Sequence, residues 1–161
     1  MSSQQLTVWG VGTTRTMQVH WLLHELALSY ETKAIGSRTG ETTQPEYRQI
    51  NPKQKIPALQ HGELNLSESL AIVSYLRDIS DVLAYDSYQQ SVEGRATYLE
   101  WASFILMELD ATSLYVMRRH RDLAQIYGEA PNAIDSAQEY CDKMLRSVDD
   151  RIPPNEGFLW G

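Results

Sequence analysis

A proline inside an apolar run constrains this chain more than any other feature. Ile56, Ala58 and Leu59 are typical of a strand, but Pro57 among them has no backbone N–H to donate. Such a proline begins an edge strand or lies in a tight turn, and an ordinary loop proline is the simpler alternative. Because the residue before a proline is extended, we expect the backbone of Ile56 to face a partner outside the sheet. The Ile56-Pro57 bond is a candidate for the cis form.

Strand and helix signals around this loop predict an α/β unit in the first half of the chain. A helix beginning near Thr16 or Met17 is indicated by apolar residues at i, i+3, i+4 and i+7. A second helix is indicated after Ser67-Glu68-Ser69, whose hydroxyls are suited to capping it. The runs typical of strands are 6–9, 30–35, 58–60 and 64–66, the last two forming a hairpin.

The remainder of the chain has helical signals and no strand signals. We expect one helix over 92–117 and another over 131–152, the second beginning at Pro131. These helices expose more apolar surface than they can cover, so either further helices are absent or a second copy covers them. The predicted domains are 1–79 (α/β), a linker at 80–90, and 91–161 (a partial all-α domain).

Composition excludes several classes of protein. The 161 residues carry a formal net charge of −7, which argues against a general nucleic-acid role. No apolar run approaches the ~20 residues of a membrane span, and the N-terminus does not resemble a signal peptide. The single cysteine, Cys141, excludes an internal disulfide and fits a reducing compartment. The sequence therefore predicts a soluble cytoplasmic protein without nucleic-acid or membrane partners.

Two segments have the chemistry to hold a small polar ligand. Thr13 and Thr14 lie between the first strand and first helix, where the helix dipole favours a thiolate or carboxylate; a plain helix cap is the alternative. Ser69 could bind a ligand carboxylate and Glu68 an ammonium group, although Ser-Glu-Ser is also ordinary helix-start chemistry.

Other candidate residues favour structural interpretations. His20 and His24 have a spacing that can bind metal, but no convincing third ligand accompanies them, so no metal is expected. The basic run at 118–121 is typical of a solvated helix end. Cys141 lies on an apolar helix seam and is expected to be a buried core thiol.

Three segments together resemble the glutathione S-transferase family, most closely its bacterial cytosolic members. They are VHWLLHELALSYE at 19–31, NPKQKIPAL at 51–59, and ESLAI at 68–72 followed by Tyr75-Leu76; the closing GFLWG at 157–161 matches more loosely. The resemblance implies a thioredoxin-like N-terminal domain followed by an all-α C-terminal domain, which is incomplete here. Gln18 stands where the family commonly has arginine or lysine, and Gln54 replaces a frequent glycine. The capping box and helix expected just after Gly161 are missing.

The resemblance also implies a role for each site residue with glutathione as co-substrate. The backbone of Ile56, beside a cis Pro57, would pair with the cysteinyl part. Glu68 and Ser69 would hold the γ-glutamyl end, and Lys55 would help with the glycyl carboxylate. The thiol would lie near Thr13 or Thr14, where the family usually has Ser, Tyr or Cys, with Arg15 adjacent.

The implied function is that of a homodimeric glutathione transferase that activates the glutathione thiol for attack on a small electrophile. One alternative is a non-catalytic interaction module with the same fold, favoured by the absence of Ser, Tyr or Cys at the thiol position. Another is peroxide or disulfide reduction that uses the sulfur of glutathione itself.

Overall fold

The computed structural model describes residues 5–80 and 91–152. The chain separates into two compact units, 1–86 and 87–161. The predicted linker at 80–90 lies outside the described residues apart from Ser80, so the domain limits at 79 and 91 stay predictions. None of the helices in the described ranges is long and apolar enough to cross a membrane.

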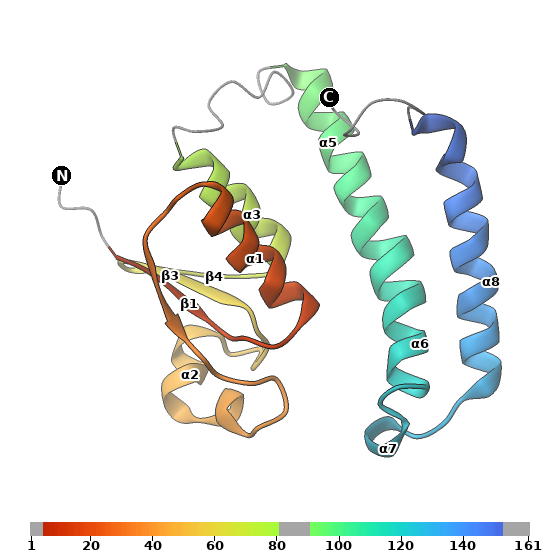
Figure 1. The fold of residues 1–161 in the computed structure, drawn as a ribbon, viewed down its shortest axis with the longest axis horizontal. Coiled ribbons are helices and arrows are strands. Elements are labelled where there is room, and N and C mark those ends of the chain that lie inside the picture. The colour runs from red at the N-terminus through yellow and green to blue at the C-terminus, as the bar shows by residue number, and fades with distance from the viewer. Residues whose placement is uncertain (1–4, 81–90, 153–161) are drawn as a thin grey trace. The chain divides into compact units, whose positions relative to one another are not determined.

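The first unit is built on a four-stranded mixed sheet with the strand order β2-β1-β3-β4 (Figure 1). Strand β1 is parallel to β2 and antiparallel to β3, and β3 is antiparallel to β4. The strands are β1 (Leu6–Trp9), β2 (Tyr30–Lys33), β3 (Ala58–His61) and β4 (Leu64–Ser67). The helices are α1 (Thr14–Glu25), the 3₁₀ turn η1 (Glu41–Thr43), α2 (Pro45–Ile50) and α3 (Ser69–Asp78).

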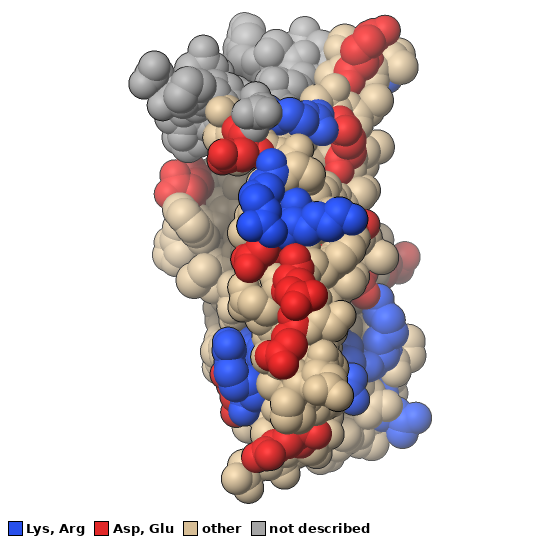
Figure 2. Space-filling model, turned by 90° about the vertical axis from the view of Figure 1, so that its right-hand side faces the viewer, with Lys and Arg blue, Asp and Glu red and all other residues tan. Residues whose placement is uncertain are grey.

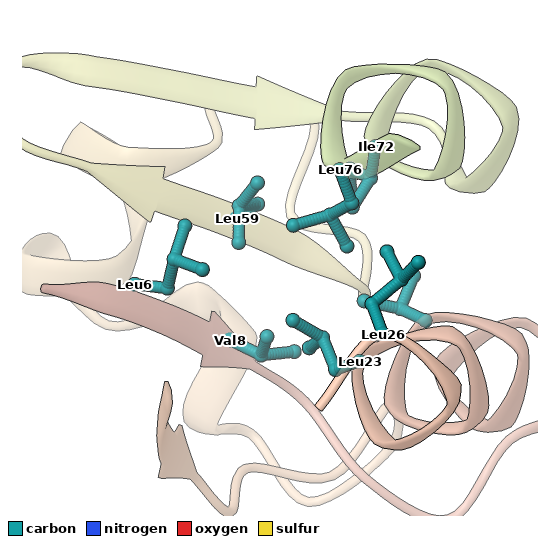
Figure 3. Packing of buried hydrophobic residues seen from close by; sticks show 8 residues of the cluster. Leu6, Val8, Leu23, Leu26, Leu59, Ile72 and Leu76 are labelled. Atoms are coloured by element: carbon teal, nitrogen blue, oxygen red, sulfur yellow. The ribbon is translucent and has the colours of Figure 1, made fainter. Parts of the chain in front are cut away.

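Helices α1 and α3 cover one face of this sheet and enclose its main apolar core. Figure 3 shows side chains of β1 and β3 pointing toward those of the two helices. Full burial of an aliphatic side chain is worth about 1.5–3 kcal/mol, so this cluster anchors both helices to the sheet. The buried members are Leu6, Val8, Val19, Leu23, Leu26, Leu59, Ile72 and Leu76.

A second, smaller cluster lies on the opposite face. Because successive strand residues point to opposite sides, Trp9 and Ala58 face away from the main core. They pack with Tyr47 of α2 and with Ile56, which precedes β3. Helix α2 therefore packs on the face of the sheet opposite α1 and α3, next to the turn that contains Pro57.

Of the two alternatives for Pro57, the structure shows the turn. Pro57 lies in the turn before β3, which is an inner strand that pairs with β1 on one side and with β4 on the other. One expectation about this unit needs correction. Helix α1 begins at Thr14, earlier than the apolar pattern indicated. The reason is Thr13, which forms a capping box with Thr16 and so starts the helix ahead of its first buried side chain.

The described part of the second unit, residues 91–152, consists of helices joined by short turns and contains no strand. The helix predicted over 92–117 is one continuous helical run with a π-helical middle. The Ser113 hydroxyl donates to the Glu108 carbonyl, five residues earlier, at 2.7 Å. The helices are α5 (Val92–Phe104), the π-helix η2 (Ile105–Leu114), α6 (Tyr115–His120), α7 (Ala124–Tyr127), α8 (Pro131–Val148) and the 3₁₀ turn η3 (Asp149–Arg151).

Helix α8 begins at Pro131 as predicted and buries part of the predicted seam. Ala137 and Cys141 pack against Met117 of α6, so Cys141 is a core thiol. Ile152, the last residue of the predicted helix, lies beyond the observed helix and is exposed. The face shown in Figure 2 carries Lys and Arg interspersed with Asp and Glu. Pro153 and Pro154, which follow the helix predicted over 131–152, lie outside the described residues, as does the closing segment 157–161.

Candidate functional site

The turn before β3 presents a backbone group to the outside of the sheet. The Ile56-Pro57 peptide bond is cis, as the resemblance implied. The Ile56 side chain is buried among Trp9, Tyr47 and Ala58, which fixes the residue in place. Within residues 5–80 and 91–152, neither the N–H nor the C=O of Ile56 has a hydrogen-bond partner. An extended ligand could therefore pair with both groups.

The preceding residue is held from inside the protein. The carbonyl oxygen of Lys55 accepts hydrogen bonds from the Tyr47 hydroxyl and from Asn51 Nδ2, the latter at 2.7 Å. Asn51 Oδ1 in turn accepts the Lys53 backbone N–H at 3.1 Å. Burial raises the pKa of the Tyr47 hydroxyl, so it keeps its proton at neutral pH. The Lys55 side chain is exposed.

Gly10, at the end of β1, fits closely against the same turn. Its φ of +113° lies in the region that favours glycine, and a Cβ placed on it would meet the Ile56 Cβ at 2.5 Å. Its carbonyl oxygen lies 3.0 Å from His20 Nε2, and His20 Nδ1 lies 3.0 Å from the Tyr30 hydroxyl. Since a carbonyl only accepts, His20 Nε2 donates the proton of its hydrogen bond to Gly10.

The start of α1 separates the two predicted threonines. Thr13 is the N-cap: its Oγ1 accepts the Thr16 N–H at 3.1 Å, and Thr16 Oγ1 accepts the Thr13 N–H at 3.0 Å. Thr14 is the first helical residue and is exposed, as is the next residue, Arg15. The Thr13 hydroxyl is thus engaged in the cap, and the Thr14 hydroxyl is accessible.

The junction of β4 and α3 differs from the expected hydroxyl cap. Glu68 occupies the N-cap position, with φ +74° and no side-chain cap hydrogen bond, and Ser69 is the first residue of the helix. A positive φ at a residue other than glycine costs about 1–3 kcal/mol and is retained mostly at functional sites. The Glu68 carboxylate is exposed and pairs with the Lys53 ammonium group of the turn, whereas Ser69 is buried.

Sheet register brings these segments to one end of the sheet. Trp9 of β1 lies opposite Ala58 of β3, and Ala58 lies opposite Ser67 of β4. The residues just beyond this row are Gly10, Pro57 and Glu68. The loop into α1, the cis-proline turn and the start of α3 are therefore neighbours, so the three predicted binding segments lie together.

Several residues that shape this region were not among the predicted site residues. Lys53, Tyr47 and Asn51 act through contacts with residues four to fifteen positions away in the chain, which no local pattern indicates. Gly10 carries a weak signal in the sequence, because it is a glycine that directly follows the predicted strand at 6–9. In the described ranges there is no group of three or more His, Cys, Asp or Glu residues that could hold a metal ion.

Comparison with known proteins agrees with this geometry. Residues 4–78 match the family model described as Glutathione S-transferase, N-terminal domain. The chain is 44% identical over 133 residues to a glutathione S-transferase of Triticum aestivum, covering 82% of this chain and 58% of that protein. It is 28% identical over 140 residues to glutathione S-transferase theta-1 of Homo sapiens, covering 83% and 56%. The chain thus spans a little over half the length of these relatives.

Solved structures with the same fold include two bacterial proteins. One is a theta class glutathione S-transferase of Xanthomonas axonopodis pv. citri with glutathione bound (TM-score 0.79, 24% identity, 98% of this chain and 74% of that chain). The other is a glutathione transferase family member of Pseudomonas fluorescens with two glutathione bound (TM-score 0.81, 22% identity, 100% and 71%). At these identities the likeness shows a shared fold.

The mixed four-stranded sheet and the cis-proline turn make the first unit a thioredoxin-like domain, and a helical region follows it, as in the fold of glutathione S-transferases. Residues 4–78 are a glutathione S-transferase N-terminal domain.

Proposed function

We propose that this chain is a glutathione transferase, or the part of one that binds glutathione and activates its thiol. One observation carries the proposal. Three features lie together at the end of the sheet, just beyond the paired strand residues Trp9, Ala58 and Ser67. They are the unpaired N–H and C=O of Ile56, the N-terminus of α1 and Glu68 with its positive φ. These groups match the successive parts of one small peptide: a backbone amide, a thiol and a zwitterionic end.

In this proposal each end of glutathione has its own partners. The N–H and C=O of Ile56 pair with the cysteinyl backbone, with Pro57 directing the chain into β3. Glu68 receives the γ-glutamyl ammonium group, and Ser69, at the start of α3, receives the carboxylate. Lys55 is exposed and attracts the glycyl carboxylate. Lys53 must share Glu68 with the incoming ammonium group, because the two side chains are paired in the free chain.

The thiol would lie at the start of α1, where helix dipole and hydroxyl favour the thiolate. Thr14, exposed and outside the cap, is the better donor of the two threonines, with Thr13 shaping the loop and Arg15 adding positive charge. A cysteine thiol has an unperturbed pKa of ~8.5, and each unit of lowering corresponds to about 1.4 kcal/mol. Lowering this pKa by one to two units, roughly, makes thiolate abundant at neutral pH.

The reaction itself is a nucleophilic attack. The thiol proton passes to water, the thiolate forms a C–S bond with the electrophilic carbon, and the leaving group departs with its bonding electron pair. The protein contributes by holding the sulfur in place and by stabilising its charge. The small electrophile is expected to contact residues of the helical region.

We also propose that the chain acts as a homodimer in the cytoplasm. The support is the number of large apolar side chains that the helical unit leaves exposed in its described residues. They are Val92, Leu99, Ile105, Met107, Leu114, Ile126, Leu145 and Ile152. Exposed apolar surface of this extent typically marks an interface.

Calorimetric titration with glutathione tests the binding proposal. We expect saturable binding that Ser69→Ala weakens about tenfold, because hydrogen bonds to charged groups contribute about 1.5–3 kcal/mol. Ser74→Ala, on the same helix, is the matched control and should leave the affinity unchanged. Absence of binding at millimolar glutathione would overturn the proposal and favour a non-catalytic interaction module. If the chain turns over a hydroperoxide but not an aryl halide, its reaction is peroxide reduction and not conjugation.

A further inference from the structure

Two buried side chains, Tyr47 and Asn51, hold the peptide group between Lys55 and Ile56. Neither has a role in the contacts with glutathione proposed above. We propose that Tyr47 and Asn51 are positioning residues that orient and polarise the Ile56 N–H for the ligand. The inference rests on the proposed function, because it concerns the backbone group that would pair with glutathione.

The geometry follows from the planarity of one peptide unit. The Lys55–Ile56 bond is trans, so its C=O and N–H lie in one plane and point in opposite directions. The oxygen accepts both the Tyr47 hydroxyl and Asn51 Nδ2. With the oxygen held from the α2 side, the Ile56 N–H is directed away from the protein interior.

Both donors are themselves held in place. Asn51 is 2% exposed, and its Oδ1 accepts the Lys53 N–H, which determines the amide orientation and leaves Nδ2 for Lys55. Tyr47 is also 2% exposed, and its ring packs against Trp9 with centroids 5.6 Å apart. Because both side chains are buried and packed, they hold the Lys55 carbonyl from inside the protein.

Two hydrogen bonds on a carbonyl also change the other end of the peptide group. Electron density shifts toward the oxygen, and the N–H of the same unit becomes a stronger donor. An unpaired N–H that is both directed outward and polarised is prepared for an acceptor such as the cysteinyl carbonyl of glutathione. Tyr47 and Asn51 would affect binding through Ile56 and would not touch the ligand.

The test uses the whole chain and compares two tyrosines that both donate a hydrogen bond. Tyr47→Phe removes one donor to the Lys55 carbonyl. Tyr75→Phe removes a hydroxyl that lies 2.7 Å from His61 Nδ1, away from the turn, and serves as the control. Asn51→Ser is the second variant, to be used if Tyr47→Phe does not fold. Each variant is assayed for the Ile56 amide resonance without glutathione, for glutathione affinity, and for initial rates.

We expect Tyr47→Phe to move the Ile56 amide proton upfield and to weaken glutathione binding about three- to tenfold, with KM rising and kcat nearly unchanged. Tyr75→Phe should change neither the Ile56 resonance nor the glutathione affinity, even if it lowers the melting temperature as much as Tyr47→Phe does. An unmoved Ile56 resonance in both Tyr47→Phe and Asn51→Ser would overturn the proposal, as would a moved resonance with unchanged affinity. If the unaltered chain binds no glutathione, the proposed function itself fails. The Ile56 resonance is measured without glutathione, so it still shows whether Tyr47 and Asn51 polarise the Ile56 N–H.

Discussion

Thr13 and Thr14 are adjacent, but the structure gives them different chemistry. The sequence placed both in a loop and left open which one contacts the thiol, because a hydroxyl before a helix serves equally as cap or as ligand donor. Thr13 closes a capping box with Thr16, and Thr14 remains exposed at the first helical position. The two positions should therefore respond differently to truncation.

Thr13→Ala should lower the free energy of unfolding by about 1 kcal/mol, the usual cost of losing an N-cap, while Thr13→Ser should retain most of it. Thr14→Ala should change stability by less than about 0.5 kcal/mol but raise the pKa seen in the pH dependence of kcat/KM for glutathione. Denaturant unfolding and a pH–rate profile measure the two effects. A Thr14→Ala enzyme with the original profile would move the thiol contact to Thr13 or remove it from both.

Glu68 has a backbone conformation that its neighbours in the sequence do not indicate. Ser67-Glu68-Ser69 has the appearance of a capping sequence, and hydroxyl caps were expected. The structure instead places Glu68 at φ +74° with its carboxylate on Lys53, and this cap prediction is wrong. A backbone angle at one residue depends on how the preceding strand meets the following helix, which local residue types do not specify.

The turn over 51–57, like the start of α3, contains a residue other than glycine with a positive φ. Gln54 has φ +56°, and its N–H donates to the Asn51 carbonyl at 3.0 Å. The sequence comparison noted glutamine where the family frequently has glycine, and the structure supplies the reason for that glycine. A side chain costs about 1–2 kcal/mol in the left-handed region.

Gln54→Gly should therefore raise the free energy of unfolding, by up to about 1 kcal/mol once the extra flexibility of glycine in the unfolded chain is subtracted. Gln60→Gly, inside β3, is the matched control and should lower stability by about 0.5–1 kcal/mol. Urea unfolding of both variants would distinguish them. Destabilisation of similar size in both would show that the turn does not hold position 54 in the left-handed region.

The longest helical run illustrates the limit of periodicity at this scale. One helix was expected over 92–117, but residues 105–114 are π-helical. The Ser113 hydroxyl bonds the Glu108 carbonyl, and the Tyr140 hydroxyl of α8 bonds the Glu108 carboxylate. Contacts with another helix thus accompany the change of helical type, and a single-helix pattern cannot contain them.

The sequence predicts that the helical half of the chain leaves apolar surface exposed. The described residues of the second unit confirm this, with side chains such as Val92 and Met107 more than half exposed. The proposal that a second copy covers such a surface has a direct consequence. Stability that depends on association rises with protein concentration.

Sedimentation velocity should show a dimer at micromolar concentration, and the melting temperature should rise across a hundredfold range of concentration. The buried Cys141 provides an internal control, because its reaction with a thiol reagent should stay slow while the helical unit is folded. A monomer at every concentration, with a constant melting temperature, would contradict the homodimer.

The order of the four strands, α1 and α3 in the first unit could be predicted from the sequence, as could the hairpin, the start of α8 and the burial of Cys141. The sequence also indicated three candidate binding segments and the resemblance to glutathione S-transferases. These follow from periodicity, from proline chemistry and from motifs that are local in the chain. Tertiary structure decided that Pro57 precedes an inner strand, that Glu68 pairs with Lys53, and that Tyr47 and Asn51 hold Lys55. Each depends on sheet pairing or on contacts between separate segments, which arise only when the chain packs.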